Sequence, residues 1–598
     1  QTGGWVLLQN CELGLGLMDK MEDMLIKFRD GEPDRFDSSF RLFITACPHP
    51  EFPLGLLQMS TKVTNEPPAG LRAGLMRSYS TIIDQDRLER IDGALWKRLL
   101  FAMCFLHSIV QERRKFGPLG WSIPYEFNTG DISACLTFLE KHLFAGNGIS
   151  WTTVQYMVSS IQYGGKITDD LDRRLFDVYT SKWISADIEK DAFMFNPPLL
   201  IGQIEENFCY KVPLQYDHAA YSRYCASFPE VDSPEISGLH PNADLTFRVK
   251  ESQKMMKSLL ANTSSSDSSG ASKANTGDGG EEEEPASPDE IVHGMAEEML
   301  TQVPENYNPD KTLMKIKALG GMEVPLNIFL YQEIQVLQFV MTQVRGNLLN
   351  VQQAIDGEIV MTDDLASTTA DIFNAKVPRL WMYHATGNEQ SWINSTMGLW
   401  MSNFADRDHQ IRHWLNNDRP PHFSFRGFFN PQGFLTAMKQ EVTRKHRSDG
   451  WALDDVIYHT EVTEYEKIES VSKGPREGIY ASGLFIDGAA WSKPTSSLVE
   501  SEPKKLFAAL PVLYVTGTTK QLRRDHIKSG AYGPNGPYEC PLYKYPVRTD
   551  RFFIGMVSLS SRAQPAGASG IGSVARDAPK KEHWILRGVA LTCSTDFE

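Results

Sequence analysis

Long apolar runs are missing from this 598-residue sequence. It contains no stretch of about 18 consecutive apolar residues, the length that a membrane-spanning helix needs. Cysteine is scarce and scattered, with eight residues and no CxxC pair, so neither a disulfide framework nor a zinc ribbon is predicted and a reducing compartment fits. Basic residues are outnumbered by acidic ones. The formal net charge of −15 disfavours nucleic-acid binding and direct attachment to an acidic filament, because like charges weaken association.

A further absence concerns the first apolar run, Gly4–Asn10. Its residues, GWVLLQN, predict a buried strand, followed by a helix at Leu13–Phe28 and a second strand at Phe40–Cys47. Strand, helix and strand with short connections is the pattern of a parallel sheet. In P-loop ATPases such a strand ends in carboxylates that hold Mg²⁺. Here those positions carry Gln9 and Asn10, whose amides supply no negative charge.

Long blocks of this sequence follow one another in the order found in dynein heavy chains. GWVLLQN, FRLFITACPHPEFPLGLLQMSTKVTNEPPAGLRAGL and QERRKFGPLGWSIPYEFN resemble the sixth AAA+ module of that family, and the match continues through IQYGGKITDDLDRR. The later blocks resemble the dynein C-terminal domain; they are SPEISGLHPNAD, FRGFFNPQGFLTAMKQE, GIYASGLFIDGAAW, YECPLYKY and HWILRGVAL. Long collinear blocks are far more specific than one short motif. The SPEISGLHPNAD block resembles axonemal dyneins more than cytoplasmic ones.

This resemblance implies a multidomain fold of the α/β plus α+β type. Residues 1–80 are expected to form the C-terminal part of the sixth AAA+ large subdomain, a partial P-loop-type sheet, and 81–200 a helical AAA+ lid. Residues 201–455 are expected to form a helical bundle and 456–598 a small antiparallel β-barrel, which together make the dynein C-terminal domain. The phosphate-binding loop of the AAA+ module is expected upstream, so we interpret Gln1 as a cut end.

Two segments of the third part stand out. Ala261–Ser287 consists mainly of Ser, Gly, Asp and Glu without a large apolar side chain, which predicts a disordered surface insertion. Asn327–Asp356 is the longest predicted helix, and its apolar residues alternate spacings of four and three. A free coiled coil carries charged residues beside its apolar seam. The residues beside this seam are mainly uncharged, so we expect the helix to pack within its own chain. Its expected neighbours are the helical stretches Leu365–Phe373 and Ile393–Phe404.

Three other helical features are predicted in the lid and bundle. Leu95–Val110 carries an apolar stripe and should pack on a core. Ser150 and Thr168 are placed to cap two short lid helices, and Asn430 to cap a helix in the bundle. From Val456 onward the period becomes strand-like, in the runs VIYHTEVT, GIYASGLFI, LPVLYVT, YECPLYKY, RFFIGMVSL and HWILRGVAL.

Several clusters imitate chemical sites but have simpler explanations. Tyr163–Thr168 reads YGGKIT, like the end of a P-loop, but Ile167 occupies the position of the Mg²⁺-binding hydroxyl. His409 and His413 are spaced as metal ligands on a helix, with Asp406 nearby, but no zincin-type Glu accompanies them. A third cluster could form a cation site, but its place at a predicted helix start explains it better; it consists of Asp169, Asp170 and Asp172. We therefore predict no metal ligands and no catalytic residues.

The resemblance assigns possible nucleotide-related roles to a few residues. Thr45 falls at the position of a sensor residue, at the end of the second strand. Three basic residues lie where a neighbouring module's nucleotide could be reached in trans, and surface or lid salt bridges are the alternative; they are Lys62, Arg72 and Arg77. We expect no cofactor in this segment, because Gln9 and Asn10 replace the acids, whereas the resemblance implies ATP and Mg²⁺ in the parent ring.

The resemblance further implies that the parent heavy chain is an ATP-driven, minus-end-directed microtubule motor of the cytoplasm and the ciliary or flagellar axoneme. The implied partners are its other AAA+ modules, intermediate and light chains, other heavy chains, and a microtubule bound through other parts of the molecule; no nucleic acid or membrane is expected. This segment would close the ring and regulate it without hydrolysing ATP. The alternatives are a cytoplasmic or intraflagellar-transport heavy chain, an enzyme whose barrel holds a sugar or nucleotide, and an adaptor that uses the acidic insertion as its handle.

Overall fold

A computed structural model of the protein describes residues 4–30, 37, 39–47, 49, 52–63, 68–145, 148–196, 200–201, 204–205, 208–213, 217–264, 287–384, 387–465, 468–533, 535–561 and 580–595. The chain divides into two compact units, residues 1–68 and 69–598, which are described separately. Of the insertion expected at Ala261–Ser287, residues 265–286 lie outside the described residues. At its start, residues 261–264 belong to a helix. At its end, Ser287 caps the next helix, because its hydroxyl accepts a hydrogen bond from Glu290 N.

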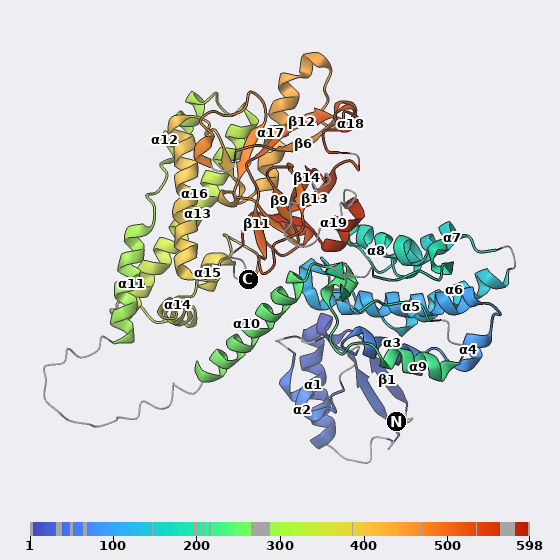
Figure 1. The fold of residues 1–598 in the computed structure, drawn as a ribbon. Coiled ribbons are helices and arrows are strands. Elements are labelled where there is room, and N and C mark those ends of the chain that lie inside the picture. Colours follow the sequence, from blue (N-terminus) through green and yellow to red (C-terminus); the bar gives the residue numbers. More distant parts are fainter. Residues whose placement is uncertain are drawn as a thin grey trace. The chain divides into compact units, whose positions relative to one another are not determined.

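The first unit contains the expected strand, helix and strand (Figure 1). Its elements are β1 (Trp5–Leu8), α1 (Leu15–Asp30), β2 (Arg41–Ile44) and α2 (Leu54–Met59). The two strands pair in parallel, with Trp5 opposite Arg41 and Leu8 opposite Ile44, which confirms the parallel pattern. The expected burial of β1 is wrong for this structure: Trp5 and Leu7 are exposed, because β2 is the only strand paired with β1 among the described residues and its outer face is uncovered.

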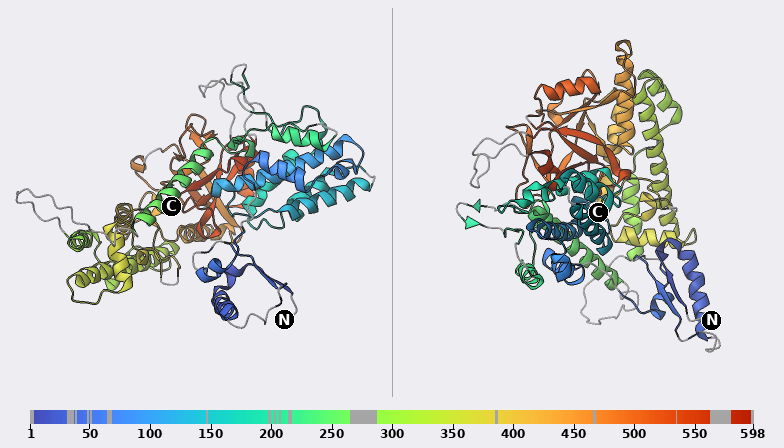
Figure 2. Two further views of the ribbon diagram at one scale, coloured as in Figure 1. Left: turned by 90° about the horizontal axis from the view of Figure 1, so that it is seen from below. Right: turned by 90° about the vertical axis from the view of Figure 1, so that its right-hand side faces the viewer.

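The second unit begins with a helical bundle (Figures 1 and 2). Its helices are α3 (Leu71–Thr81), α4 (Gln85–Glu89), α5 (Ala94–Arg113), α6 (Thr129–Phe144), α7 (Trp151–Tyr156), α8 (Asp170–Trp183) and α9 (His218–Ala226). Two short strands lie between α8 and α9, β3 (Leu200–Ile201) and β4 (Ile204–Glu205). The predicted single stripe on α5 understates its burial, because every residue from Leu99 to Val110 is buried. This helix packs against α3, α6 and α8 and forms the centre of the bundle.

The caps of the lid helices differ partly from expectation. Ser150 precedes α7, but its hydroxyl bonds to the Thr153 hydroxyl and not to a backbone N–H. Thr168 does not cap α8. The cap is Asp169, whose carboxylate accepts hydrogen bonds from Leu171 N and Asp172 N at 2.8 and 2.9 Å. A charged acceptor at this position stabilises the helix more than a hydroxyl, because it also interacts with the helix dipole.

A second group of helices follows. They are α10 (Asn242–Ser264), α11 (Pro288–Gln302), α12 (Pro309–Ala318), α13 (Pro325–Ile355), α14 (Asp363–Phe373), α15 (Arg379–Met382), α16 (Met397–Asn417) and α17 (Pro431–Lys445). Asn430 caps α17 as predicted, accepting a hydrogen bond from Gly433 N at 2.8 Å. The helix predicted around Ile393–Phe404 begins only at Met397, and Trp392 and Ile393 precede it in irregular backbone.

The long helix α13 matches the predicted heptad helix closely. Its seam is buried at seven of eight positions, and Ile355 is half-buried; the buried residues are Leu330, Ile334, Leu337, Met341, Val344, Leu348 and Val351. The helix packs against the two expected neighbours, α14 and α16, and also against α11 and α17, which were not predicted. The buried Glu333 strengthens the contact with the start of α17, because its carboxylate accepts hydrogen bonds from Phe429 N and Asn430 N.

The strands of the second unit form two main sheets in place of the expected antiparallel barrel. One has the order β5-β7-β12-β6 and the other β11-β8-β15-β13-β14, and no closed barrel is found within the described residues. Their strands are β5 (Phe423–Ser424), β6 (Val456–Val462), β7 (Ile479–Ser482), β8 (Phe485–Asp487), β11 (Phe507–Ala509), β12 (Leu513–Thr519), β13 (Tyr538–Tyr543), β14 (Phe553–Leu559) and β15 (Ala590–Thr592). β9 (Ala490–Ser492) and β10 (Ser497–Val499) form a hairpin.

Two features differ from the expected antiparallel barrel. Both sheets are mixed, since β5 pairs with β7 and β13 with β15 in parallel. In addition, the apolar run HWILRGVAL, predicted as the last strand, is mostly the helix α19 (Lys581–Arg587), which ends at Gly588 with a φ of 66°. Another helix, α18 (Lys520–Lys528), follows β12 directly. Within the described residues, no helix combines the length and the apolar character needed to span a bilayer.

Candidate functional site

The end of the first strand brings together the residues expected at a degenerate nucleotide edge. Asn10 adopts a left-handed conformation with a φ of 54°, which asparagine tolerates better than most residues. Its backbone N–H donates to the Thr45 hydroxyl at 3.1 Å, and Thr45 N donates to Leu8 O at 2.9 Å. Gln9 is exposed beside them. The structure thus places Asn10 next to Thr45.

A carboxylate close to this edge has a structural partner. Glu12 accepts a hydrogen bond from Cys47 N at 3.2 Å, so it fastens the segment after β2 to the turn after β1. Glu12 was not predicted.

The three basic residues suggested for contacts in trans do not form one group. Lys62 is exposed in the first unit. In the second unit, Arg72 pairs with Glu230 at 3.4 Å, as the salt-bridge alternative predicts, and Arg77 is exposed on α3. A nucleotide contact for any of them stays a prediction.

The other imitations of chemical sites have structural roles. The YGGKIT segment forms the turn after α7, where Lys166 pairs with Asp131 at 2.7 Å. His409 and His413 lie exposed on α16 with Asp406. Asp172 is buried, and its carboxylate accepts hydrogen bonds from Ser122 N and Ile123 N at 3.0 and 3.1 Å. Burial raises the pKa of Asp172, and these two hydrogen bonds oppose the shift.

The most elaborate arrangement of buried charge among the described residues joins the lid helices to the C-terminal sheet. At its centre is Arg113, the last residue of α5, which is 0% exposed. Its guanidinium donates to Gly120 O at 2.8 Å, to the Tyr179 hydroxyl at 2.8 Å and to Leu586 O at 2.9 Å, and also to Ser237 O. Burial lowers the pKa of Arg113, and the contact with Tyr179 opposes that shift.

These partners come from parts of the sequence that are far apart. Leu586 belongs to α19, near the end of the sequence, and Ser237 to the turn before α10. We call this arrangement the junction; it comprises Arg113, Gly120, Arg174, Tyr179, Ser237, Gly238, Leu239, Glu500, Leu586, Arg587 and Gly588. It connects three of the blocks that resemble dynein, QERRKFGPLGWSIPYEFN, SPEISGLHPNAD and HWILRGVAL.

A second arginine completes the junction on the side of α19. Arg587 donates to Gly238 O at 3.2 Å and to Leu239 O, and it pairs with Glu500 at 3.1 Å. Two glycines permit this close approach. Gly238 and Gly588 have φ of 79° and 66°, and an added Cβ would lie 2.8 Å from Leu586 Cβ and 2.5 Å from Leu119 O respectively. Any other residue at these positions would push α19 away from the lid.

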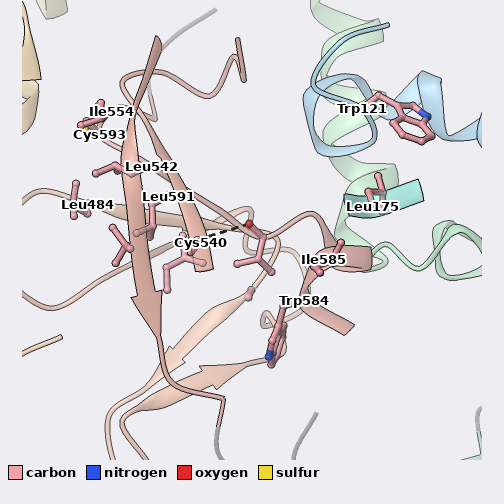
Figure 3. Close-up of a cluster of buried hydrophobic side chains, with 14 of the residues drawn as sticks. Trp121, Leu175, Leu484, Cys540, Leu542, Ile554, Trp584, Ile585, Leu591 and Cys593 are labelled. Carbon is pink, nitrogen blue, oxygen red and sulfur yellow. Dashed lines mark hydrogen bonds between the residues drawn. The ribbon is translucent and has the colours of Figure 1, made fainter. Parts of the chain in front are cut away.

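Figure 3 shows a cluster of buried apolar side chains that includes residues of α8 and α19, the helices that carry Tyr179 and Arg587 of the junction. Leu175 of α8 lies near Ile585 of α19, and the helices α8 and α19 pack together. Arg174, also on α8, donates to Glu539 O of β13 at 3.0 Å and lies over the Tyr538 ring. The lid is therefore attached to the C-terminal sheet by both packing and hydrogen bonds.

The junction encloses only a small cavity. Its volume is about 40 Å³, and Arg113, Asp172, Arg174 and Arg548 are among its lining residues. A buried water needs about 10 to 15 Å³, so the cavity accommodates water but no nucleotide or sugar. The hydrogen bonds and packing of the junction suit mechanical attachment of the lid to the C-terminal sheet.

Sequence reasoning missed the junction. From the sequence alone, the cationic run that includes Arg113 is a charged helix end, and HWILRGVAL is a predicted strand. No local pattern marks an arginine whose partners lie 124 and 473 residues away. A signal was nevertheless present, because both blocks belong to the family resemblance and both combine an arginine with a nearby glycine.

The Glu500 carboxylate gives the junction a dependence on pH. Hydrogen bonds and charges from His583 and Arg587 overcome burial and lower the pKa of Glu500 from 4.5 to about 2. Since the folded pKa is depressed, its stabilisation is present above pH 4.5 and is lost as the pH falls towards 2. Glu500→Gln is expected to reduce the acid-side loss of melting temperature between pH 4.5 and 3, by an amount equivalent to at most about 1 kcal/mol because the side chain is partly exposed. Identical acid profiles for the variant and the parent would contradict this.

Comparison with known families agrees with the order of these parts. Residues 1–64 match the family model of the region D6 P-loop domain of dynein heavy chains, 96–243 that of their AAA lid domain, and 249–593 that of their C-terminal domain. A partial P-loop sheet, an AAA+ lid and a mixed helix and sheet domain therefore define the architecture. The protein belongs to the dynein heavy chain family and corresponds to the C-terminal part of an axonemal member.

The similar proteins are axonemal heavy chains. The sequence is 41% identical to dynein axonemal heavy chain 5 of Mus musculus and to dynein axonemal heavy chain 8 of Homo sapiens, over 99% of its own length. It is 40% identical to the dynein gamma chain of the flagellar outer arm of Chlamydomonas reinhardtii, again over 99% of its length. It spans only 11% to 12% of the length of these relatives.

Proposed function

We propose that this protein is the ring-closing and regulatory C-terminal segment of an axonemal dynein heavy chain, a motor driven by ATP along microtubules in the cilium or flagellum. The four parts proposed for it are those of the sequence interpretation, at 1–80, 81–200, 201–455 and 456–598. The junction carries the proposal: it fastens the AAA+ lid to the C-terminal domain through Arg113 and Arg587, so movement of the lid is transmitted to that domain.

The names of the relatives favour an axonemal over a cytoplasmic or intraflagellar-transport motor. They also favour an outer-arm assignment, because identity is 40% to the flagellar outer-arm gamma chain and 30% to the 1-beta heavy chain of the flagellar inner arm I1 complex. The proposed partners are the remaining AAA+ modules, other heavy chains, intermediate and light chains, and a microtubule bound through other parts of the heavy chain. ATP and Mg²⁺ would be bound by those other modules.

Motility of a complete heavy chain tests the role of the junction. In Arg113→Met the lid loses its hydrogen bond to Leu586 O of α19, so microtubule gliding is expected to slow while nucleotide affinity at the other modules is kept. Arg114→Met, which changes the neighbouring half-exposed arginine, is the matched control and should glide normally. Equal gliding by the two variants would show that the junction contributes only to stability.

The segment itself is expected neither to bind nor to hydrolyse ATP. The strand ends carry Gln9 and Asn10 where acids would hold Mg²⁺, and the Thr45 hydroxyl already accepts a hydrogen bond from Asn10 N. Calorimetric titration of the 598-residue protein with Mg-ATP should give no binding heat, and phosphate release should equal the rate without protein. A micromolar affinity would contradict this expectation.

A further inference from the structure

Three side chains that can ligate metals converge where α18 lies against β6. His459 and Glu461 are two residues apart on β6, so they share one face of the strand. His526 comes from α18, which begins directly after β12, the strand paired with β6. The pairing sets Thr516 opposite His459 and Tyr514 opposite Glu461, and α18 then folds back over both strands.

The distances fit a shared ion. Glu461 Oε1 lies 2.9 Å from His459 Nε2 and 3.3 Å from His526 Nε2, and the three ligand atoms all lie within 4.8 Å of one another. In a tetrahedral zinc site, ligand bonds of about 2.0 to 2.2 Å separate the ligand atoms by roughly 3.3 to 3.5 Å. Small side-chain rotations therefore suffice to admit an ion between the three groups.

Charge and exposure agree with this geometry. The Glu461 carboxylate supplies the negative charge that a divalent cation favours. The three side chains are 13%, 46% and 35% exposed, in sequence order, which leaves one side open for a water ligand. The nearby cation Arg523 is already paired with Glu539 at 2.5 Å.

A metal ion at this site would strengthen the attachment of α18 to the sheet. None of the residues of α18 is buried, and its half-buried residues are Arg523, His526 and Ile527. Apolar burial therefore holds this helix only weakly. A metal ion bound by one residue of α18 and two residues of β6 would fix the helix to the sheet, because metal ligation contributes directly to the stability of the folded form.

We propose that His459, Glu461 and His526 form a binding site for a divalent transition-metal ion of the zinc type, with water as the fourth ligand, and that the ion fastens α18 to β6. Two nitrogen ligands and one carboxylate are a donor set suited to Zn²⁺, and they disfavour Mg²⁺ and Ca²⁺, which prefer oxygen ligands only.

Metal titration of the 598-residue protein tests the proposal. After treatment with a chelator, the protein is titrated with Zn²⁺ by calorimetry and with Co²⁺ by visible absorption, which reports tetrahedral coordination. One equivalent of tight binding is expected, with affinity at least about 10-fold lower in His526→Gln and in Glu461→Gln. His413→Gln, which changes an exposed histidine on α16, is the matched control and should bind as the parent does.

Hydrogen exchange of the parent protein provides a readout that needs no variant. Zn²⁺ is expected to slow amide exchange in residues 520–528 and in β6, and Mg²⁺ at the same concentration is expected to have no effect. Binding that survives in both ligand variants, binding lost equally in His413→Gln, or unchanged exchange in α18 with Zn²⁺ would each overturn the proposal. In that case the three groups would be a hydrogen-bonded cluster without metal.

Discussion

Replacing Arg113 with methionine is expected to lower the free energy of unfolding by about 3 kcal/mol. Methionine keeps the aliphatic stem but removes every donor, so the buried carbonyls of Gly120 and Leu586 lose the guanidinium, whereas Ser237 O keeps its hydrogen bond from the Tyr179 hydroxyl. Each buried acceptor left unpaired costs about 1 to 3 kcal/mol, so the two carbonyls together cost about 2 to 6 kcal/mol. Relief from burying the guanidinium charge offsets part of that sum, so a net loss of about 3 kcal/mol is expected.

The measurement is the midpoint and slope of urea unfolding for the 598-residue protein. Arg114→Met is the control: its side chain is 43% exposed and forms only a 3.4 Å contact with Glu126, so it should change stability by less than about 0.5 kcal/mol. Since Leu586 is one of the partners, amide exchange in α19 should also accelerate in Arg113→Met alone. Superimposable unfolding curves for Arg113→Met and the parent would refute the central role given to this side chain.

Truncating Leu337 in the middle of α13 is expected to cost about 2 to 5 kcal/mol, because the Leu337→Ala change removes apolar contacts and leaves a cavity. Leu337 is 0% exposed, and α13 is covered by α11, α14, α16 and α17 from the same molecule. The loss should be seen as a lower urea midpoint. Leu348→Ala, at another fully buried position of the seam, should give a loss in the same range.

The control for these truncations must lie on the exposed side of α13. Gln352 lies off the apolar seam but is half-buried, whereas Gln353 is exposed, so Gln353→Ala is the better control and should cost little. The loss in Leu337→Ala should also be independent of protein concentration, because the seam is covered within one molecule. A loss that shrinks at high concentration would instead indicate that α13 pairs with a second copy.

Local periodicity explains why some elements were predictable. The seam of α13 repeats over many turns, and only a helix satisfies such a repeat, so its bounds were predicted to within two residues. The order of β1, α1 and β2 was equally predictable from the sequence, because short connections between strand and helix allow few topologies. The parallel pairing of these strands brings the strand-end residues Asn10 and Thr45 next to each other.

Long-range contacts explain the failures. The run HWILRGVAL is short and apolar, and such a run fits a strand or a buried helix equally well. Its helical form depends on burial of Trp584 and Ile585 against distant parts of the sequence and on Gly588 at the helix end. His459 and His526 lie far apart in the sequence, on a strand and a helix, and nothing local indicates that α18 folds back over β6. The tertiary structure therefore had to be known before either site could be identified.

The uncovered face of β1 has a practical consequence for biochemistry on this segment. Trp5 and Leu7 are 72% and 55% exposed, and their strand has β2 as its sole partner among the described residues. Exposed apolar strands of this kind are templates on which further molecules add and aggregate. Samples in which the sheet of residues 1–68 stands alone should therefore lose solubility as they are concentrated, and a charged substitution at Leu7 is the simplest remedy, because it disrupts the apolar face.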